Sequence, residues 1–165
     1  MPEVLPQWEA IAEGIEWERV LMKCQAVLAG ALASVLVTCA ASADVRIVSD
    51  PGGEVSAYVQ KFRELRASGE RIVIDGPCLS ACTLLTGIIP RDRICVTRRA
   101  VLGFHAASYY DDASRSLVPT REGSRVVMRL YPPAIRAWIQ RHGGLTPRII
   151  GLRGRELAAL YPACQ

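Results

Sequence analysis

The stretch from Ile72 to Ile88 constrains the fold of this chain more than any other. It begins with three β-branched residues, which is the pattern of a short buried strand. A loop with a glycine and a proline follows, and Ser80 then leads into an apolar segment without a polar face. A later apolar run, at residues 100–104, is followed directly by His105, 25 residues after the serine. We therefore expect the serine at the start of a buried helix and the histidine at the end of a neighbouring strand.

Periodicity and turn residues divide the remainder of residues 44–165 into further elements. The order strand, helix, strand, helix, strand predicts an α/β fold with a parallel β-α-β core and right-handed crossovers. A helical C-terminal part, from residue 120 onward, is expected to pack against this core, and residues 109–119 are expected to be polar and irregular. The expected strands span 45–48, 71–75, 93–97 and 100–104, and the expected helices span 55–65, 79–88, 120–130, 132–142 and 147–160.

The first 43 residues are typical of an export signal rather than of a folded domain. Lys23, the apolar run after it and the small residues at 41–43 predict a signal peptide over residues 22–43. The apolar run is shorter than the ~20 residues that a membrane-spanning helix needs. We therefore expect a single domain over residues 44–165, located in the periplasm or secreted, with no membrane span after cleavage.

Residues 1–21 do not fit this pattern, since they carry five glutamates. Signal peptides begin with positive charge, so we interpret this segment as a wrongly assigned start, with translation beginning at Met22. A genuine acidic, amphipathic extension is the alternative. Residues 36–39 also resemble a lipobox, which would make Cys39 a lipid attachment site, but Thr38 is large for the position before that cysteine.

The charge of the expected domain is strongly positive. Residues 1–43 hold two of the 20 basic and five of the 16 acidic side chains, which leaves 18 basic and 11 acidic groups in the other 122 residues. A balance of this kind is found in nucleic-acid-binding proteins. Here the basic residues are spread along the chain, and neither an aromatic-interleaved RNA-binding motif nor a recognition helix accompanies them. We interpret the charge as a solvated basic surface and expect no nucleic-acid partner.

Four cysteines lie in the expected domain, an even number that is typical of two disulfides in an exported protein. Cys78 and Cys82 flank the start of one helix, so a bond between them is expected to be the least favourable pairing. We expect each of them to bond with either Cys95 or Cys164. A zinc site is the alternative, although neither a cysteine pair with C-x2-C spacing nor clustered histidines are present. We expect no metal and no organic cofactor.

Three segments of the chain resemble the Clp protease proteolytic subunit family. Segment 49–55, Ser-Asp-Pro-Gly-Gly-Glu-Val, resembles the family's glycine-rich turn. Segment 76–81 resembles its nucleophile loop, with a glycine four residues before the serine, and segment 101–105 resembles the strand that ends in its catalytic histidine. The spacing between serine and histidine also agrees. The resemblance extends over residues 45–108 and implies a Clp-protease/crotonase-type fold in a small exported member.

This resemblance implies serine-dependent hydrolysis of a peptide or a similar acyl bond. Ser80 would be the nucleophile and His105 its general base, because a serine hydroxyl attacks effectively only when a base removes its proton. The N–H of Ala81, at the helix start, would bind the oxyanion, and the resemblance assigns the second donor to Gly53. A simpler interpretation of the same residues is that Ser80 caps the helix, that the glycines form a turn and that His105 ends a strand.

The chain departs from the family at the third catalytic position. No aspartate follows Asp112, so the family's aspartate has no counterpart. Glu156 is the nearest candidate to orient the histidine, and Asp111 and Asp112 are alternatives in a loop. A serine–histidine dyad, a triad completed by Glu156 and an inactive relative therefore all stay open.

Two further classes of function compete with a hydrolase. One is a non-catalytic binding or scaffold protein of the periplasm that has the same fold. The other is an acyl-CoA-binding member of the crotonase group, which the expected export disfavours because coenzyme A is a cytoplasmic metabolite. Self-association is compatible with each class, and the sequence does not define the substrate beyond a peptide or other acyl compound.

Overall fold

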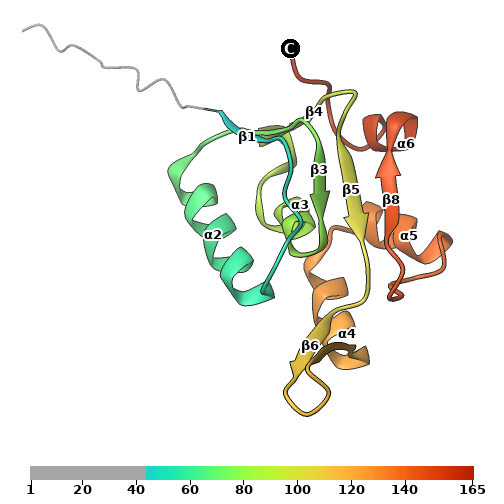
Figure 1. Cartoon of the computed structure of the whole chain (residues 1–165). Coiled ribbons are helices and arrows are strands. Elements are labelled where there is room, and N and C mark those ends of the chain that lie inside the picture. The colour runs from blue at the N-terminus through green and yellow to red at the C-terminus, as the bar shows by residue number, and fades with distance from the viewer. Residues whose placement is uncertain (1–43) are drawn as a thin grey trace, which may run out of the picture. The chain divides into compact units, whose positions relative to one another are not determined.

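The computed structural model describes residues 44–165, and these residues form a mixed α/β fold (Figure 1). The α/β class expected from the sequence is confirmed. The predicted signal peptide at 22–43, the preceding segment 1–21 and the lipobox-like residues 36–39 lie outside the described residues. Within residues 44–165, no helix combines the length and the apolar character needed to cross a bilayer.

Two three-stranded sheets form the centre of the fold. The first has the order β1-β2-β4 and is parallel throughout, and α2 connects β1 to β2, so the predicted parallel β-α-β arrangement is confirmed there. The second has the order β3-β5-β8, in which β3 and β5 are parallel and β8 is antiparallel to β5. These elements are β1 (Val45–Ile47), α2 (Val55–Ser68), β2 (Ile72–Ile74), β3 (Pro77–Leu79), β4 (Ile94–Val96), β5 (Val101–Phe104) and β8 (Ile150–Arg153).

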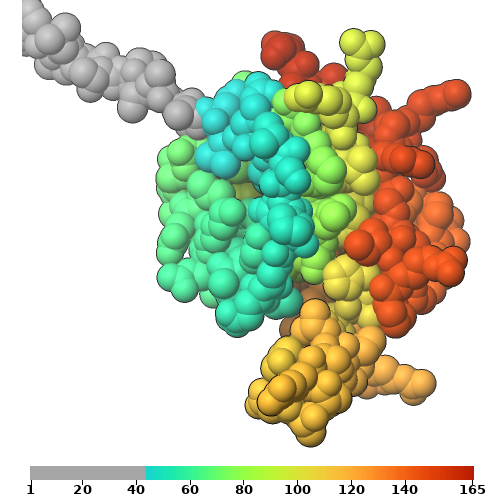
Figure 2. Space-filling view, viewed as in Figure 1, coloured from blue at the N-terminus to red at the C-terminus, as the bar shows by residue number. Residues whose placement is uncertain are grey.

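The other elements of residues 44–165 are short helices and one hairpin. The hairpin of β6 and β7 protrudes from the rest of the described residues (Figure 2) and exposes Tyr109, Tyr110 and Leu117. These elements are the 3-10 helix Ser80–Leu84, α3 (Leu85–Ile88), the 3-10 helix Arg91–Arg93, β6 (Ser108–Asp111), β7 (Ser116–Pro119), α4 (Arg121–Leu130), α5 (Pro133–Arg141) and α6 (Gly154–Ala158).

The two sheets are joined where the chain passes from β2 to β3. Gly76 lies against the end of β1, and a Cβ atom there would stand 1.9 Å from the carbonyl oxygen of Val48, so only glycine fits. Beyond β1, the backbone of Asp50 pairs with β3: its N–H donates to Pro77 O and its carbonyl accepts from Leu79 N, both at 2.8 Å. This pairing holds the loop after β1 against the segment that leads into Ser80.

Two expectations about the C-terminal half were wrong. Residues 109–119 form the hairpin of β6 and β7 instead of an irregular segment, and residues 147–160 contain β8 and the short α6 instead of one helix. In β8, buried Leu152 lies between exposed Gly151 and Arg153, which is the alternation of a strand. Residues 150–153 form a strand because they pair with the edge of β5. The sequence pattern does not reveal that this edge is available.

Asp75, directly after β2, is the most heavily bonded carboxylate of the fold. It is only 8% exposed, and it accepts hydrogen bonds from Arg99 Nε (3.1 Å), Thr97 Oγ1 (2.8 Å) and Arg46 Nη1 (2.9 Å). The bonds from Arg99, and then from Thr97, hold the pKa of the Asp75 carboxyl well below its usual range. The carboxylate therefore ties the end of β2 to Arg46 of β1 and to the loop after β4.

This depressed pKa predicts a loss of stability in acid. The unfolded chain binds a proton at Asp75 more readily than the folded one, so the stabilisation is complete above the ordinary aspartate pKa of about 4 and is lost as the pH falls further. We expect Asp75→Asn to lower the melting temperature at neutral pH and to flatten its decline in acid. Exposed Asp92 provides the control, Asp92→Asn. Thermal unfolding followed by circular dichroism across this pH range is the measurement, and equal acid slopes for Asp75→Asn and the wild type would contradict the assignment.

Candidate active site

Ser80 adopts a backbone conformation that a serine rarely takes. It follows β3 directly and begins the 3-10 helix, and its φ is +55°. Only Arg115, in the hairpin turn, shares a positive φ among the non-glycine residues that the structure describes. A left-handed conformation at a non-glycine residue costs energy and persists only where surrounding contacts enforce it, often at functional sites. Ser80 is the first residue of this helix, and Leu79 occupies the cap position, so the simpler interpretation of Ser80 as the helix cap does not hold.

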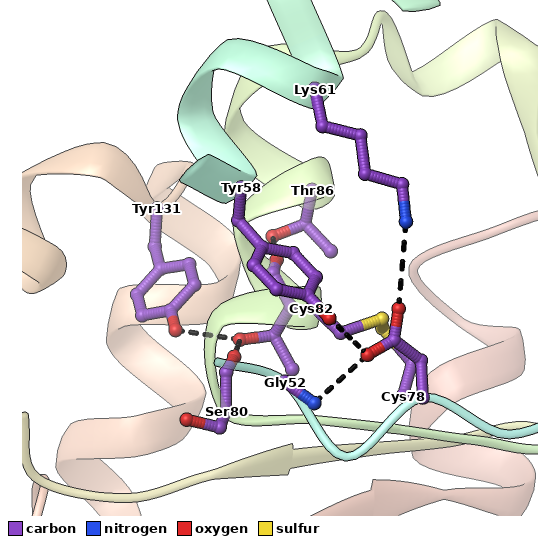
Figure 3. Close-up of a disulfide and its surroundings, with 10 residues drawn as sticks. Gly52, Tyr58, Lys61, Cys78, Ser80, Cys82, Thr86 and Tyr131 are labelled. Atoms are coloured by element: carbon purple, nitrogen blue, oxygen red, sulfur yellow. Dashed lines mark hydrogen bonds and ion pairs between the residues drawn. A yellow bond between two sulfur atoms is a disulfide. The ribbon is translucent and has the colours of Figure 1, made fainter. Parts of the chain in front are cut away.

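A buried chain of hydroxyls holds the backbone of Ser80 in place (Figure 3). Thr83 Oγ1 donates to the carbonyl oxygen of Ser80 at 2.6 Å, so the 2.7 Å bond between Thr83 and Tyr131 must be donated by the tyrosine. Burial raises the pKa of Tyr131 to about 12, which keeps its hydroxyl protonated. The Ser80 hydroxyl points away from these bonds and from the nearby disulfide (Figure 3).

The disulfide that flanks Ser80 joins Cys78 to Cys82, and the expected pairing of these residues with Cys95 or Cys164 was wrong. The tight turn at Ser80 brings the Cα atoms of Cys78 and Cys82 to 5.3 Å, within the normal range for a disulfide, and both residues are fully buried. The second bond joins Cys95 on β4 to Cys164. Within residues 44–165, no cluster of three or more potential ligand side chains is arranged to hold a metal ion.

His105 reaches the same edge of the second sheet as Ser80. In the parallel pair β3 and β5, Leu79 lies opposite Gly103, so the residues that follow the two strands emerge side by side. Ser80 and His105 both line one small cavity of about 20 Å³, together with the side chains of Val55, Val127 and Tyr131. A space of this size accommodates about one water-sized group. The structure thus brings together the two residues that the sequence singled out.

The hydrogen bonding of His105 sets the orientation of its ring. Its Nδ1 lies 2.7 Å from the carbonyl oxygen of Ala106, which can only accept, so Nδ1 carries the proton and donates. In the neutral ring Nε2 is then the free acceptor, which is the tautomer that a general base requires. No hydrogen bond joins Ser80 to His105 in the described structure, and such bonds are often long in unliganded sites.

Glu156 does not lie behind His105. Its carboxylate lies 3.8 Å from Nε2 of His142, at the C-terminal end of α5. The strand register also separates it from the site, because Arg153 pairs with Val101, at the end of β5 opposite His105. Asp111 lies at the end of β6, where it accepts from the N–H of Ser114 in the hairpin turn. The backbone carbonyl of Ala106, and not the predicted Glu156, is what orients His105.

The two expected oxyanion donors lie on the segments that meet at Ser80. Outside the regular bonds of helices and strands, no hydrogen bond from Gly53 N–H or Ala81 N–H to another group is found within residues 44–165. Gly52, with a φ of +83°, packs so tightly against this turn that a Cβ atom would lie 2.6 Å from Ser80 Cβ and 2.8 Å from Ala81 N. This contact places the glycine turn directly beside the first turn of the 3-10 helix (Figure 3).

Asp50 positions the glycine turn, a role that the sequence did not reveal. Its Oδ1 accepts from Gly52 N at 2.8 Å and from the Tyr58 hydroxyl at 2.6 Å, and Lys61 Nζ lies 3.8 Å from its Oδ2 (Figure 3). Partial burial, and then the bond to Asp50, raise the pKa of Tyr58 to about 12. The bond from Gly52 N–H to the Asp50 carboxylate forms an Asx-turn. An aspartate two residues before a glycine is the sequence signal that could have predicted it.

Comparison with known proteins gives this site no independent support: no protein family matches the chain, and no curated protein matches it.

Proposed function

We propose that the protein is an exported serine hydrolase with a fold of the Clp-protease type, which cleaves a peptide or similar acyl bond with a Ser80–His105 dyad. One observation carries the proposal. Ser80, in a left-handed conformation that buried contacts enforce, and His105, in the tautomer of a base, line one cavity at the ends of paired parallel strands. The two disulfides favour an oxidising compartment outside the cytoplasm.

The proposed reaction has two steps. Ser80 Oγ forms a bond to the substrate's carbonyl carbon while its proton passes to Nε2 of His105, and the tetrahedral oxyanion accepts bonds from the N–H groups of Gly53 and Ala81. The bond to the leaving group then breaks, and the leaving group takes the proton from His105. Water next attacks the acyl group on Ser80, giving a proton to His105, and Ser80 regains a proton as the acid departs.

An active-site label tests this proposal. A fluorophosphonate probe should form a Ser80 Oγ–phosphorus bond with loss of fluoride, and mass spectrometry should locate the adduct on Ser80. Ser80→Ala should abolish labelling, whereas Ser114→Ala, in the exposed hairpin turn, should leave it intact. Labelling that persists in Ser80→Ala would remove this residue from the mechanism.

A non-catalytic binding protein with the same fold is the second candidate. The observation in its favour is that no hydrogen bond joins Ser80 to His105 and that Glu156 pairs with His142 instead. A folded wild-type protein that neither takes up the probe nor cleaves activated acyl substrates would support this candidate against the hydrolase.

A further inference from the structure

A larger groove lies next to the cavity of Ser80 and His105. Its volume is about 480 Å³, and Ala106, the residue whose carbonyl orients His105, lines both the groove and the cavity. Its walls come from α4, from the end of β7 and from the loop at residues 145–147. Backbone bonds connect these walls to the site: Ala106 N donates to Thr146 O, and Thr120 N donates to Ala107 O. A molecule bound in the groove would therefore lie within one residue of the proposed base.

The lining of this groove combines an apolar floor with two cations. Met128, Leu145 and two prolines contribute apolar surface, and Arg121 and Arg125 contribute the charge. No carboxylate is among the residues that line it, and Glu122, although next to Arg121 in sequence, is not part of the lining. This composition suits a ligand with an apolar chain that ends in an anion.

The two arginines occupy positions that the helix itself disfavours. They are four residues apart on α4, so their like charges project from the same face, which is destabilising in an isolated helix. Arg121 is also the first residue of the helix, where the macrodipole favours negative charge. Neither arginine pairs with a carboxylate of residues 44–165. An anion bound between them would remove both penalties.

We propose that this groove binds a carboxylate carried on an apolar chain, and that it thereby selects acyl substrates with a negatively charged group beside the bond that Ser80 attacks. A guanidinium matches a carboxylate with two parallel hydrogen bonds, so a pair of arginines fixes both the charge and the direction of the chain. The selection of substrates rests on the proposed hydrolase function, whereas the binding of a carboxylate does not.

Binding is tested on the Ser80→Ala protein, which cannot turn over a substrate. Nuclear magnetic resonance titration with hexanoate, and with the neutral hexanamide of equal length, measures the affinity for each. We expect hexanoate to bind more tightly, and Arg121→Ala/Arg125→Ala to weaken it about tenfold, as two exposed ion pairs allow, with hexanamide unchanged. Arg129→Ala, on the same helix but outside the groove, is the matched control. Equal binding of the two ligands, or an equal loss in the control, would overturn the proposal.

Selectivity is tested on the active protein with the p-nitroanilides of N-acetyl-glutamate and N-acetyl-glutamine. We expect a higher kcat/KM for the glutamate substrate, and we expect the preference to fall about tenfold in Arg121→Ala/Arg125→Ala and to weaken with added salt. Hydrolysis without this preference would overturn the groove proposal alone. Absence of any Ser80-dependent hydrolysis would count against the proposed function, while the titration would still decide the binding site.

Discussion

His105→Ala is expected to lower kcat for the hydrolysis of activated acyl substrates by about 10²–10⁴-fold, the usual contribution of a positioned general base. The reason lies in the geometry of the ring. Because Nδ1 donates to the Ala106 carbonyl, Nε2 is the nitrogen left to take the proton of Ser80. In the proposed mechanism, alanine at this position leaves the serine with its full proton-transfer barrier, although the proposed oxyanion donors stay in place. Stopped-flow or steady-state kinetics with a p-nitrophenyl ester measure the loss.

The chain offers a matched control, because its sequence contains only one other histidine. His142 stacks on Trp138, with ring centroids 4.0 Å apart, and lies near Glu156, away from the proposed site. We expect His142→Ala to keep near wild-type kcat, and added imidazole to restore part of the activity of His105→Ala but not of Ser80→Ala. An equal loss in both histidine variants would show that the effect is structural and would contradict the assigned base.

The second large effect is expected on stability. The bond between Cys95 and Cys164 closes a loop with a sequence separation of 69, and Cys164 N also donates to the carbonyl oxygen of Val96, the last residue of β4. Loop-closure entropy assigns a bond of this span about 4 kcal/mol. We therefore expect Cys95→Ser/Cys164→Ser to lower the free energy of unfolding by about that amount. Urea denaturation followed by fluorescence is the measurement.

The other disulfide provides the comparison for this experiment. Its two cysteines are only four residues apart in the sequence, so the same loop-closure relation gives a stabilisation of about 2 kcal/mol. Cys78→Ser/Cys82→Ser should thus lose less stability, yet it should reduce fluorophosphonate labelling more, because its bond encloses Ser80. If the variant without the 95–164 bond lost no more stability than the variant without the 78–82 bond, the argument from loop length would be wrong.

The parts of the fold that the sequence predicted are those set by local pattern. The buried strand before Ser80, the strand before His105 and the long helix α2 with its glycine stop at Gly69 all formed as expected. Strand β3, at Pro77–Leu79, was not predicted, because these residues were expected to form a loop and the first turn of a helix. Its parallel pairing with β5 is what brings serine and histidine to one edge.

What the sequence did not predict depends on contacts between distant segments or on backbone angles. The strand β8 forms because β5 has a free edge with which it can pair. Because this pairing is antiparallel, Glu156 follows β8 at the end of β5 that lies opposite His105. The bond between Cys78 and Cys82 depends on the left-handed backbone of Ser80, which no periodicity encodes. Tyr131 and Thr83 have the sequence pattern of ordinary core residues. Only the structure shows that the Tyr131 hydroxyl bonds to Thr83, whose own hydroxyl donates to the Ser80 carbonyl.

The position of Ser80 between two bonded sulfurs has a practical consequence for trapping experiments. A nucleophilic serine is often exchanged for cysteine to slow the second half of the reaction. Here Ser80→Cys would place a third sulfur two residues from each half of an existing disulfide. In the folded chain this side chain points away from the disulfide, but while the chain folds and oxidises a thiolate at this position can pair with Cys78 or Cys82 instead. The engineered chain would then be a mixture of isomers. Crystallographic capture of a bound substrate is better attempted with alanine at this position.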